Sequence, residues 1–69
     1  MIKKIKVEGM SCGHCVKRVE KALNAIDGVT GVVVDLTLGQ VDLDMNRDID
    51  FRVLHDAVDE AGYDATGEL

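Results

Sequence analysis

Hydrophobic residues recur at two different periods along this 69-residue chain, and the order of these periods limits the possible folds most strongly. Apolar and polar residues alternate over 2–8, 32–38 and 41–45, which is typical of half-buried strands. Apolar residues recur every three or four positions from Val16 to Ile26 and from Phe51 to Ala61, as in amphipathic helices. With a short last strand over 63–68, the predicted order is β, α, β, β, α, β.

Glycine and aspartate residues mark the ends of these elements. Asp27-Gly28 and Gly62 follow the two predicted helices, and glycine readily adopts the left-handed conformation that ends a helix. Asp50 fits the N-cap of the second helix, because its carboxylate can accept a hydrogen bond from a free backbone N–H group. Residues 38–41 join two alternating stretches and predict a hairpin.

This order of elements is typical of the ferredoxin-like α+β fold, in which two helices cover one face of a four-stranded antiparallel sheet. Right-handed crossovers would place the first strand between the third and the fourth. Lys4 and Lys6 would then lie opposite Asp42 and Asp44 on the open face, as exposed pairs that help to set the register. The length predicts one domain over residues 1–69.

Composition excludes several classes of protein. The chain is 46% hydrophobic and 30% charged, so it is too apolar for a disordered acidic tail and too charged to insert into a membrane. Its N-terminal residues include lysines but no uninterrupted apolar segment, so we expect no signal peptide and a cytoplasmic protein. The net charge of −5 argues against binding to nucleic acid.

The charges are distributed unevenly. Acidic residues are concentrated between positions 42 and 60, whereas Lys17, Arg18 and Lys21 follow shortly after Cys15. Such charges commonly serve solubility alone. Alternatively, they form a polar docking surface beside the cysteines that steers a partner.

The only two cysteines, Cys12 and Cys15, lie three positions apart in the segment GMSCGHC, residues 9–15. Cys12 is predicted in the loop after the first strand and Cys15 in the first helical turn, where free backbone N–H groups and the helix dipole favour a thiolate. Lys17 and Arg18 would support the thiolate if their side chains approach it. Such a pair can bind one soft metal ion or form one disulfide.

The number of available ligands indicates which metal suits the pair. Structural zinc takes four protein ligands, and the only histidines, His14 and His55, are far apart in the predicted fold. Calcium and magnesium prefer oxygen ligands, which no loop of the chain assembles in the EF-hand pattern. Two thiolates suit Cu(I) best, and an exposed two-coordinate ion leaves room for an incoming thiolate, which favours transfer over storage.

Residues 9–15 resemble the Gly-Met-Thr/Ser-Cys-x-x-Cys signature of heavy-metal-associated domains. The β, α, β, β, α, β order, the Gly-Tyr-Asp-Ala ending at 62–65 and the total length agree over essentially the whole chain. A free-standing domain of this size is similar to bacterial copper chaperones, which carry Cu(I) to copper-transporting P-type ATPases. The resemblance implies Cys12 and Cys15 as the metal ligands, Met10 buried beneath the loop, and Tyr63 close to the metal.

Four further residues are candidates for contacts around the ion. The Met10 thioether is a possible third ligand, although packing in the core is favoured. Ser11 directly precedes the first cysteine. His14 is most simply a solvated side chain, with coordination or tuning of the thiolate charge as alternatives. Tyr63 either packs against the sheet or donates a hydrogen bond to a thiolate.

The leading hypothesis is a non-enzymatic carrier of one Cu(I) ion that exchanges thiolate ligands with the metal-binding domain of an ATPase and forms a copper-dependent homodimer. Alternatives are an N-terminal metal-binding domain of such an ATPase, a mercury-binding protein, or a redox protein. Cys-Gly-His-Cys also occurs in protein disulfide isomerases. Their thioredoxin fold, however, is longer, expects an aromatic residue where Ser11 stands, and needs a cis-proline, whereas this chain has no proline.

Overall fold

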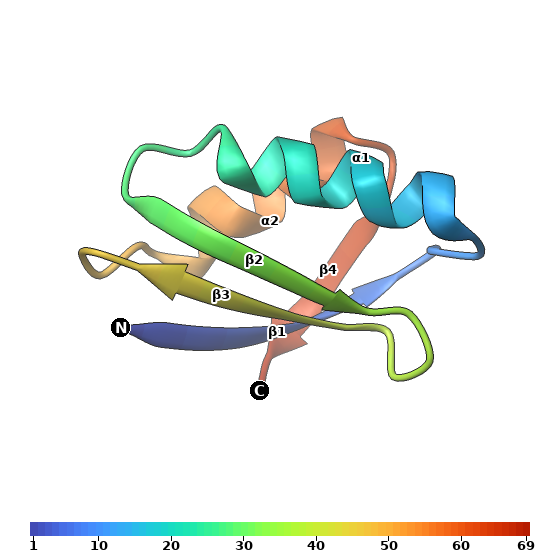
Figure 1. Cartoon of the computed structure of the whole chain (residues 1–69), viewed down its shortest axis with the longest axis horizontal. Helices are drawn as coiled ribbons and strands as arrows, with labels where there is room; N and C mark the ends of the chain where they lie inside the picture. Colours follow the sequence, from blue (N-terminus) through green and yellow to red (C-terminus); the bar gives the residue numbers. More distant parts are fainter.

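A computed structural model describes all residues, 1–69, and contains the six elements in the predicted order (Figure 1). The strands are β1 (Ile2–Glu8), β2 (Val29–Asp35), β3 (Gln40–Met45) and β4 (Asp64–Glu68), and the helices are α1 (Gly13–Asn24) and α2 (Phe51–Glu60). The strands form one antiparallel sheet in the order β2-β3-β1-β4. Figure 1 shows both helices on the same face of this sheet. The predicted ferredoxin-like fold, with β1 between β3 and β4, is therefore confirmed.

The core lies between the sheet and the two helices. Alternate residues of β1 and β3 point toward the helices, and each helix contributes two fully buried residues spaced four apart. All the buried side chains are apolar, so the interior contains no polar group that needs a partner. The buried residues are Ile5, Val7, Val19, Leu23, Val41, Leu43, Met45, Ile49, Leu54, Val58 and Ala65.

Local hydrogen bonds determine where the helices begin and end. The Asp50 carboxylate accepts a hydrogen bond from the Arg52 backbone N–H at 3.0 Å, which confirms the predicted N-cap of α2. α1 ends at Asn24, earlier than predicted, because the Ile26 N–H donates to the Leu23 carbonyl at 3.1 Å and tightens the last turn. Neither helix has the length and apolar character needed to cross a membrane.

The predicted extent of the second strand was wrong. β2 begins at Val29 and ends at Asp35, and residues 36–39 form the turn that leads into β3. The Asp35 carboxylate accepts a hydrogen bond from the Leu38 backbone N–H at 3.1 Å, which favours a turn over continued pairing. Gly39 then adopts a φ of 63°, a conformation that costs glycine little.

The predicted pairing of charges across β1 and β3 was half right. Lys4 lies opposite Asp42, as expected, but Lys6 lies opposite Gln40 and not opposite Asp44. The register places Ile2 opposite Asp44, so only one of these two lysines faces an aspartate.

Candidate metal-binding site

The two thiols lie side by side where β1 leads into α1. Cys12 is the N-cap of α1, and its carbonyl accepts hydrogen bonds from the backbone N–H groups of Cys15 at 3.1 Å and Val16 at 3.3 Å. These bonds place Cys15 in the first turn, as predicted. The Sγ atoms are 3.7 Å apart, with Cys12 exposed and Cys15 half-buried. The fold thus presents both sulfurs together at the surface.

The separation of the sulfurs is that of two free thiols that lie close together. At 3.7 Å the Sγ atoms are not bonded, since a disulfide bond is about 2.05 Å long. If each metal–sulfur bond is about 2.3 Å, as for zinc thiolates, a linear arrangement needs sulfurs about 4.6 Å apart. The pair must therefore open by roughly 0.9 Å, which rotation of the exposed Cys12 side chain can supply.

Local hydrogen bonds lower the pKa of the Cys15 thiol to about 6. The largest cause is a hydrogen bond from the Ser11 backbone N–H, and the Tyr63 hydroxyl is next. Partial burial opposes them, while the Ser11 hydroxyl, with Oγ 3.9 Å from Cys15 Sγ, and the Cys12 thiol add smaller effects in the same direction. At neutral pH Cys15 is therefore mainly a thiolate, the form that binds metal.

The source of this stabilisation differs from the prediction. We expected free N–H groups of the helix and the nearby Lys17 and Arg18 to favour the thiolate. The strongest donor is instead the backbone of Ser11, which lies before the helix, and neither basic residue is among the causes of the shift at Cys15. Arg18 instead favours a lower pKa of Tyr63, against the larger effects of Cys15 and burial that raise it.

Tyr63 reaches the site from the segment between α2 and β4. It is half-buried and packs against the hydrophobic core. Its phenol pKa is raised, mainly because the hydroxyl donates a hydrogen bond to Cys15 and secondarily because of burial. On another side of the ring, a Cβ atom at Gly9 would lie 3.4 Å from Tyr63 Cδ1, so the Gly9 backbone passes close to it. Residues distant in sequence thus meet at the thiol pair.

The remaining candidates occupy different environments. Met10 is half-buried and packs against the core, whereas Ser11 and His14 are exposed. No group of three or more histidine, cysteine, aspartate or glutamate side chains is arranged to hold a metal ion. The donor set at this surface therefore consists of two thiols, which suits a soft monovalent ion and not a closed tetrahedral site.

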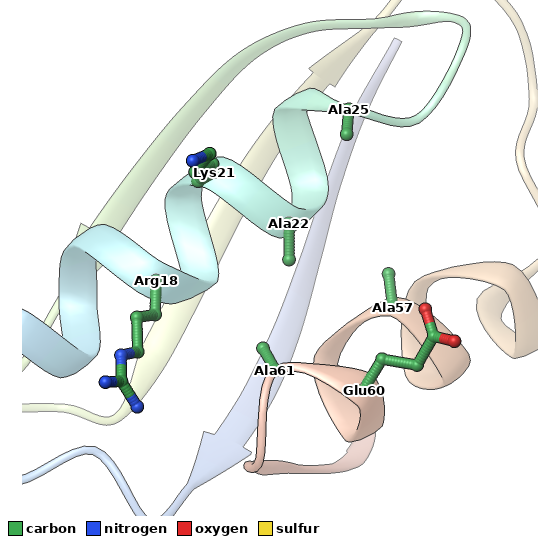
Figure 2. Close-up of a pocket in the computed structure, with 7 residues that line it drawn as sticks. All are labelled: Arg18, Lys21, Ala22, Ala25, Ala57, Glu60 and Ala61. Atoms are coloured by element: carbon green, nitrogen blue, oxygen red, sulfur yellow. The ribbon is translucent and has the colours of Figure 1, made fainter.

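A groove of about 470 Å³ separates α1 from α2 and contains neither cysteine (Figure 2). Arg18 and Lys21 line it on α1 and Glu60 lines it on α2. Sequence reasoning missed this groove because its small side chains are divided between two helices. Four alanines complete the lining: Ala22, Ala25, Ala57 and Ala61.

Comparison with known families agrees with the site geometry. Residues 4–64 match the heavy-metal-associated domain family. The chain belongs to this family. The match includes most of β1, the thiol pair, both helices, β2 and β3, and it ends at the first residue of β4.

Similar proteins include free-standing chaperones and an ATPase domain. The chain is 44% identical over 63 residues to the copper chaperone CopZ of Bacillus subtilis, covering 90% of this chain and 91% of the relative. A solved CopZ metallochaperone has a TM-score of 0.88 at 43% identity, with 96% and 100% of the two chains covered. The N-terminal domain of a potential copper-translocating P-type ATPase from B. subtilis, solved in the Cu(I)-loaded state, has a TM-score of 0.80 at 36% identity, with 100% and 92% covered.

Proposed function

We propose that this heavy-metal-associated chain, acting as one domain over residues 1–69, is a copper chaperone that binds one Cu(I) ion through Cys12 and Cys15. The observation that carries the proposal is the exposed, unbonded thiol pair, with sulfurs 3.7 Å apart and the pKa of one thiol lowered to about 6. Cu(I) favours thiolates, and the pair can supply two. The similarity to CopZ chaperones over nearly the full length of both chains supports copper as the cargo.

Transfer would proceed by exchange of thiolate ligands. A thiolate of the acceptor first joins the bound ion, giving a three-coordinate intermediate. Cys12 then leaves, a second acceptor thiolate binds, and Cys15 is released. Copper stays Cu(I) throughout, and no bond of a substrate is broken, so this activity is not enzymatic. Cys12 is the sulfur we expect to meet the partner first, because it is the more exposed of the two.

We propose the metal-binding domain of a copper-transporting P-type ATPase as the partner. The similarity in fold to such an ATPase domain supports this choice, because a partner built in the same way would present its own thiols on a matching loop. We also propose the cytoplasm as the compartment, since free thiols persist in reducing environments.

Anaerobic titration of the reduced protein with Cu(I) tests the proposed ligands. We expect one ion per monomer, measured by competition with a chromophoric Cu(I) chelator. A Cys12→Ser, Cys15→Ser double variant should lose the site. Stoichiometric binding by that variant, or no binding by the unmodified protein, would contradict the proposal.

Single substitutions at neighbouring positions provide the controls. Because His14 is exposed and Met10 packs against the core, His14→Ala and Met10→Leu should both retain one site per monomer. Loss of the site in either variant would assign a third ligand to that residue.

A further inference from the structure

β2 is an edge strand whose outer side has no strand beside it. It pairs with β3 along one side only, as Figure 1 shows. The opposite edge of the sheet, β4, is short and carries exposed acidic residues at both ends, Asp64 and Glu68. Short length and charge commonly protect an edge from pairing with another chain. Residues 29–34 of β2, in contrast, include neither a charge nor a proline, so β2 is the edge that is open to pairing.

The register determines which backbone groups of β2 point outward. The Met45 N–H donates at 2.8 Å to the carbonyl of the residue before β1, so it faces β1 and not β2. Backbone groups alternate in direction along a strand, so those of Asp42 face β2, where its partner is Val33. The neighbours Val32 and Val34 therefore direct their N–H and C=O groups away from the sheet, and neither takes part in a hydrogen bond to a turn or loop.

A second copy of the strand fits these free groups. Antiparallel pairing about a two-fold axis at Val33 places Val32 of each chain opposite Val34 of the other. Each of these pairs exchanges two N–H···O bonds, so every free group of the two residues finds a partner. Val33 is 68% exposed, on the face of the sheet away from the helices, and it would meet its own counterpart across the axis. The edge is therefore complementary to itself.

Charge favours a copy of the chain at this edge over a charged peptide. A net charge of −5 makes two copies repel over most of their surfaces, but residues 29–34 are uncharged. The nearest charge is Asp35, whose carboxylate already accepts a hydrogen bond from the Leu38 N–H at 3.1 Å. In the pairing it lies opposite Gly31 of the second copy, which has no side chain to obstruct it. A charged peptide finds no ion partner along residues 29–34, whereas a second copy needs none.

We propose that two copies of the chain pair through their β2 edges, antiparallel about a two-fold axis at Val33, and so form one continuous sheet. Neither cysteine lies on this edge, so the pairing requires no metal and is separate from any dimer that shares copper. One pair of strands buries less than the roughly 1,200 Å² of a stable interface, so we expect a weak dimer with a Kd on the order of 1 mM. At micromolar concentrations the copper-free protein therefore remains monomeric.

Amide hydrogen exchange, followed by NMR at two protein concentrations, tests the pairing. The full chain is kept reduced and free of metal by a chelator, so that the thiols share no ion. Exchange at Val32 and Val34 should slow about twofold between about 0.05 and 2 mM protein, because their N–H groups become hydrogen-bonded in the dimer. Exchange at the amides of β4 should not change. Added salt should increase the slowing, because it screens the repulsion between two negatively charged chains.

Two lysine substitutions locate the contact. Val33→Lys brings two like charges together at the two-fold axis and should abolish the dependence on concentration. Because the Val33 side chain is exposed, the melting temperature should change little. Thr66→Lys is the matched control, since it adds the same charge at an exposed position of β4, and it should retain the dependence. Both variants lower the net negative charge equally, so a difference between them reports the position of the contact.

Three results would overturn the pairing: exchange at Val32 and Val34 that does not depend on concentration, the same behaviour in Val33→Lys and Thr66→Lys, or equal slowing at the amides of β4, which would indicate non-specific association. No copper is present in these measurements, so their failure would leave the proposed function unaffected. Failure of the protein to bind Cu(I) would likewise leave the pairing unaffected.

Discussion

Tyr63 and Cys15 share one hydrogen bond that shifts their pKa values in opposite directions. The Ser11 backbone N–H, and after it the Tyr63 hydroxyl, lower the pKa of the Cys15 thiol to about 6, and the interaction with Cys15 raises the pKa of the Tyr63 phenol. The phenol therefore remains a donor over the pH range in which the thiol loses its proton. A tyrosine that joins α2 to β4 thus helps to keep a cysteine at the start of α1 in its thiolate form.

Thiol reactivity as a function of pH should report this contact. In a Cys12→Ser variant, the rate of Cys15 alkylation should rise with pH through a midpoint near 6, because the thiolate is the reactive form. Adding Tyr63→Phe should move the midpoint to higher pH, since the thiolate loses a donor. Adding Ser11→Ala should move it less, because the Ser11 hydroxyl contributes less than Tyr63 and its backbone N–H remains.

A midpoint near the free-cysteine value of about 8.5 in the starting variant would contradict the lowered pKa. An unchanged midpoint after Tyr63→Phe would show that the Tyr63 hydroxyl does not affect the pKa of Cys15.

Burial predicts where a single truncation is most damaging. Leu54 is fully buried in the core, so Leu54→Ala should lower the free energy of unfolding by about 2–5 kcal/mol. Its neighbour Val53 is 45% exposed, and Val53→Ala should change that free energy by no more than about 0.5 kcal/mol. Urea unfolding of both variants measures the difference. Similar losses at the two positions would mean that α2 does not present Leu54 to the core.

Two glycines beside the thiols should respond in opposite directions to alanine. Gly9 has a φ of +97°, which strains a residue with a Cβ atom, so Gly9→Ala should destabilise the fold by about 1–2 kcal/mol. At Gly13, in contrast, φ is not positive and no atom lies within 4 Å of an added Cβ. Gly13→Ala should therefore stabilise the protein by about 0.4–1 kcal/mol, because it restricts the unfolded chain. Thermal unfolding of the two variants measures the direction of each change in stability. Destabilisation by Gly13→Ala would contradict the prediction.

The order of the elements could be predicted from sequence because each hydrophobic period depends on nearby residues. The end of β2 could not, since the Asp35 side chain competes for the Leu38 N–H and replaces a strand with a turn. The alternation of apolar and polar residues continues through Leu36 and Leu38, although both of these side chains are exposed. Residue propensity and hydrophobic period therefore predict whether a segment is a strand or a helix, but not the residue at which it ends.

The candidate site, too, could be predicted from sequence only in part. Cys12 and Cys15 are close in sequence, so their proximity follows from one helical turn. The main donor to Cys15, however, is the Ser11 backbone, whose direction depends on the conformation of the loop. The effect of Tyr63 on Cys15 depends on how the segment after α2 lies beside the start of α1, which no local pattern encodes.

Copper should promote association of two copies. An exposed ion with two thiolate ligands can accept sulfurs from a second molecule, and a two-fold axis would place two such sites together. Sedimentation velocity should therefore show a monomer for the copper-free protein and a dimer that increases with concentration for the loaded protein. Cys12→Ser, which lacks the more exposed sulfur, should remain monomeric. A loaded protein that is monomeric at every concentration would argue against shared coordination.

Transfer to the proposed ATPase partner should depend on the basic residues of α1. Lys17, Arg18 and Lys21 are exposed and form no ion pair, so they can attract an acidic partner surface at long range. Such steering weakens as salt shortens the Debye length from about 10 Å at 0.1 M to about 3 Å at 1 M. The second-order rate constant of copper transfer, followed by stopped flow, should therefore fall as salt rises.

Charge reversal at two lysines tests where this steering originates. Lys21→Glu should slow transfer at low salt, with a smaller effect at high salt, because it reverses a charge on α1. Lys4→Glu makes the same change on the open face of the sheet, away from the helices, and should leave the rate nearly unchanged. Equal slowing by both variants would indicate a general effect of net charge. A rate that does not depend on salt would leave the charged residues of α1 with solubility as their only role.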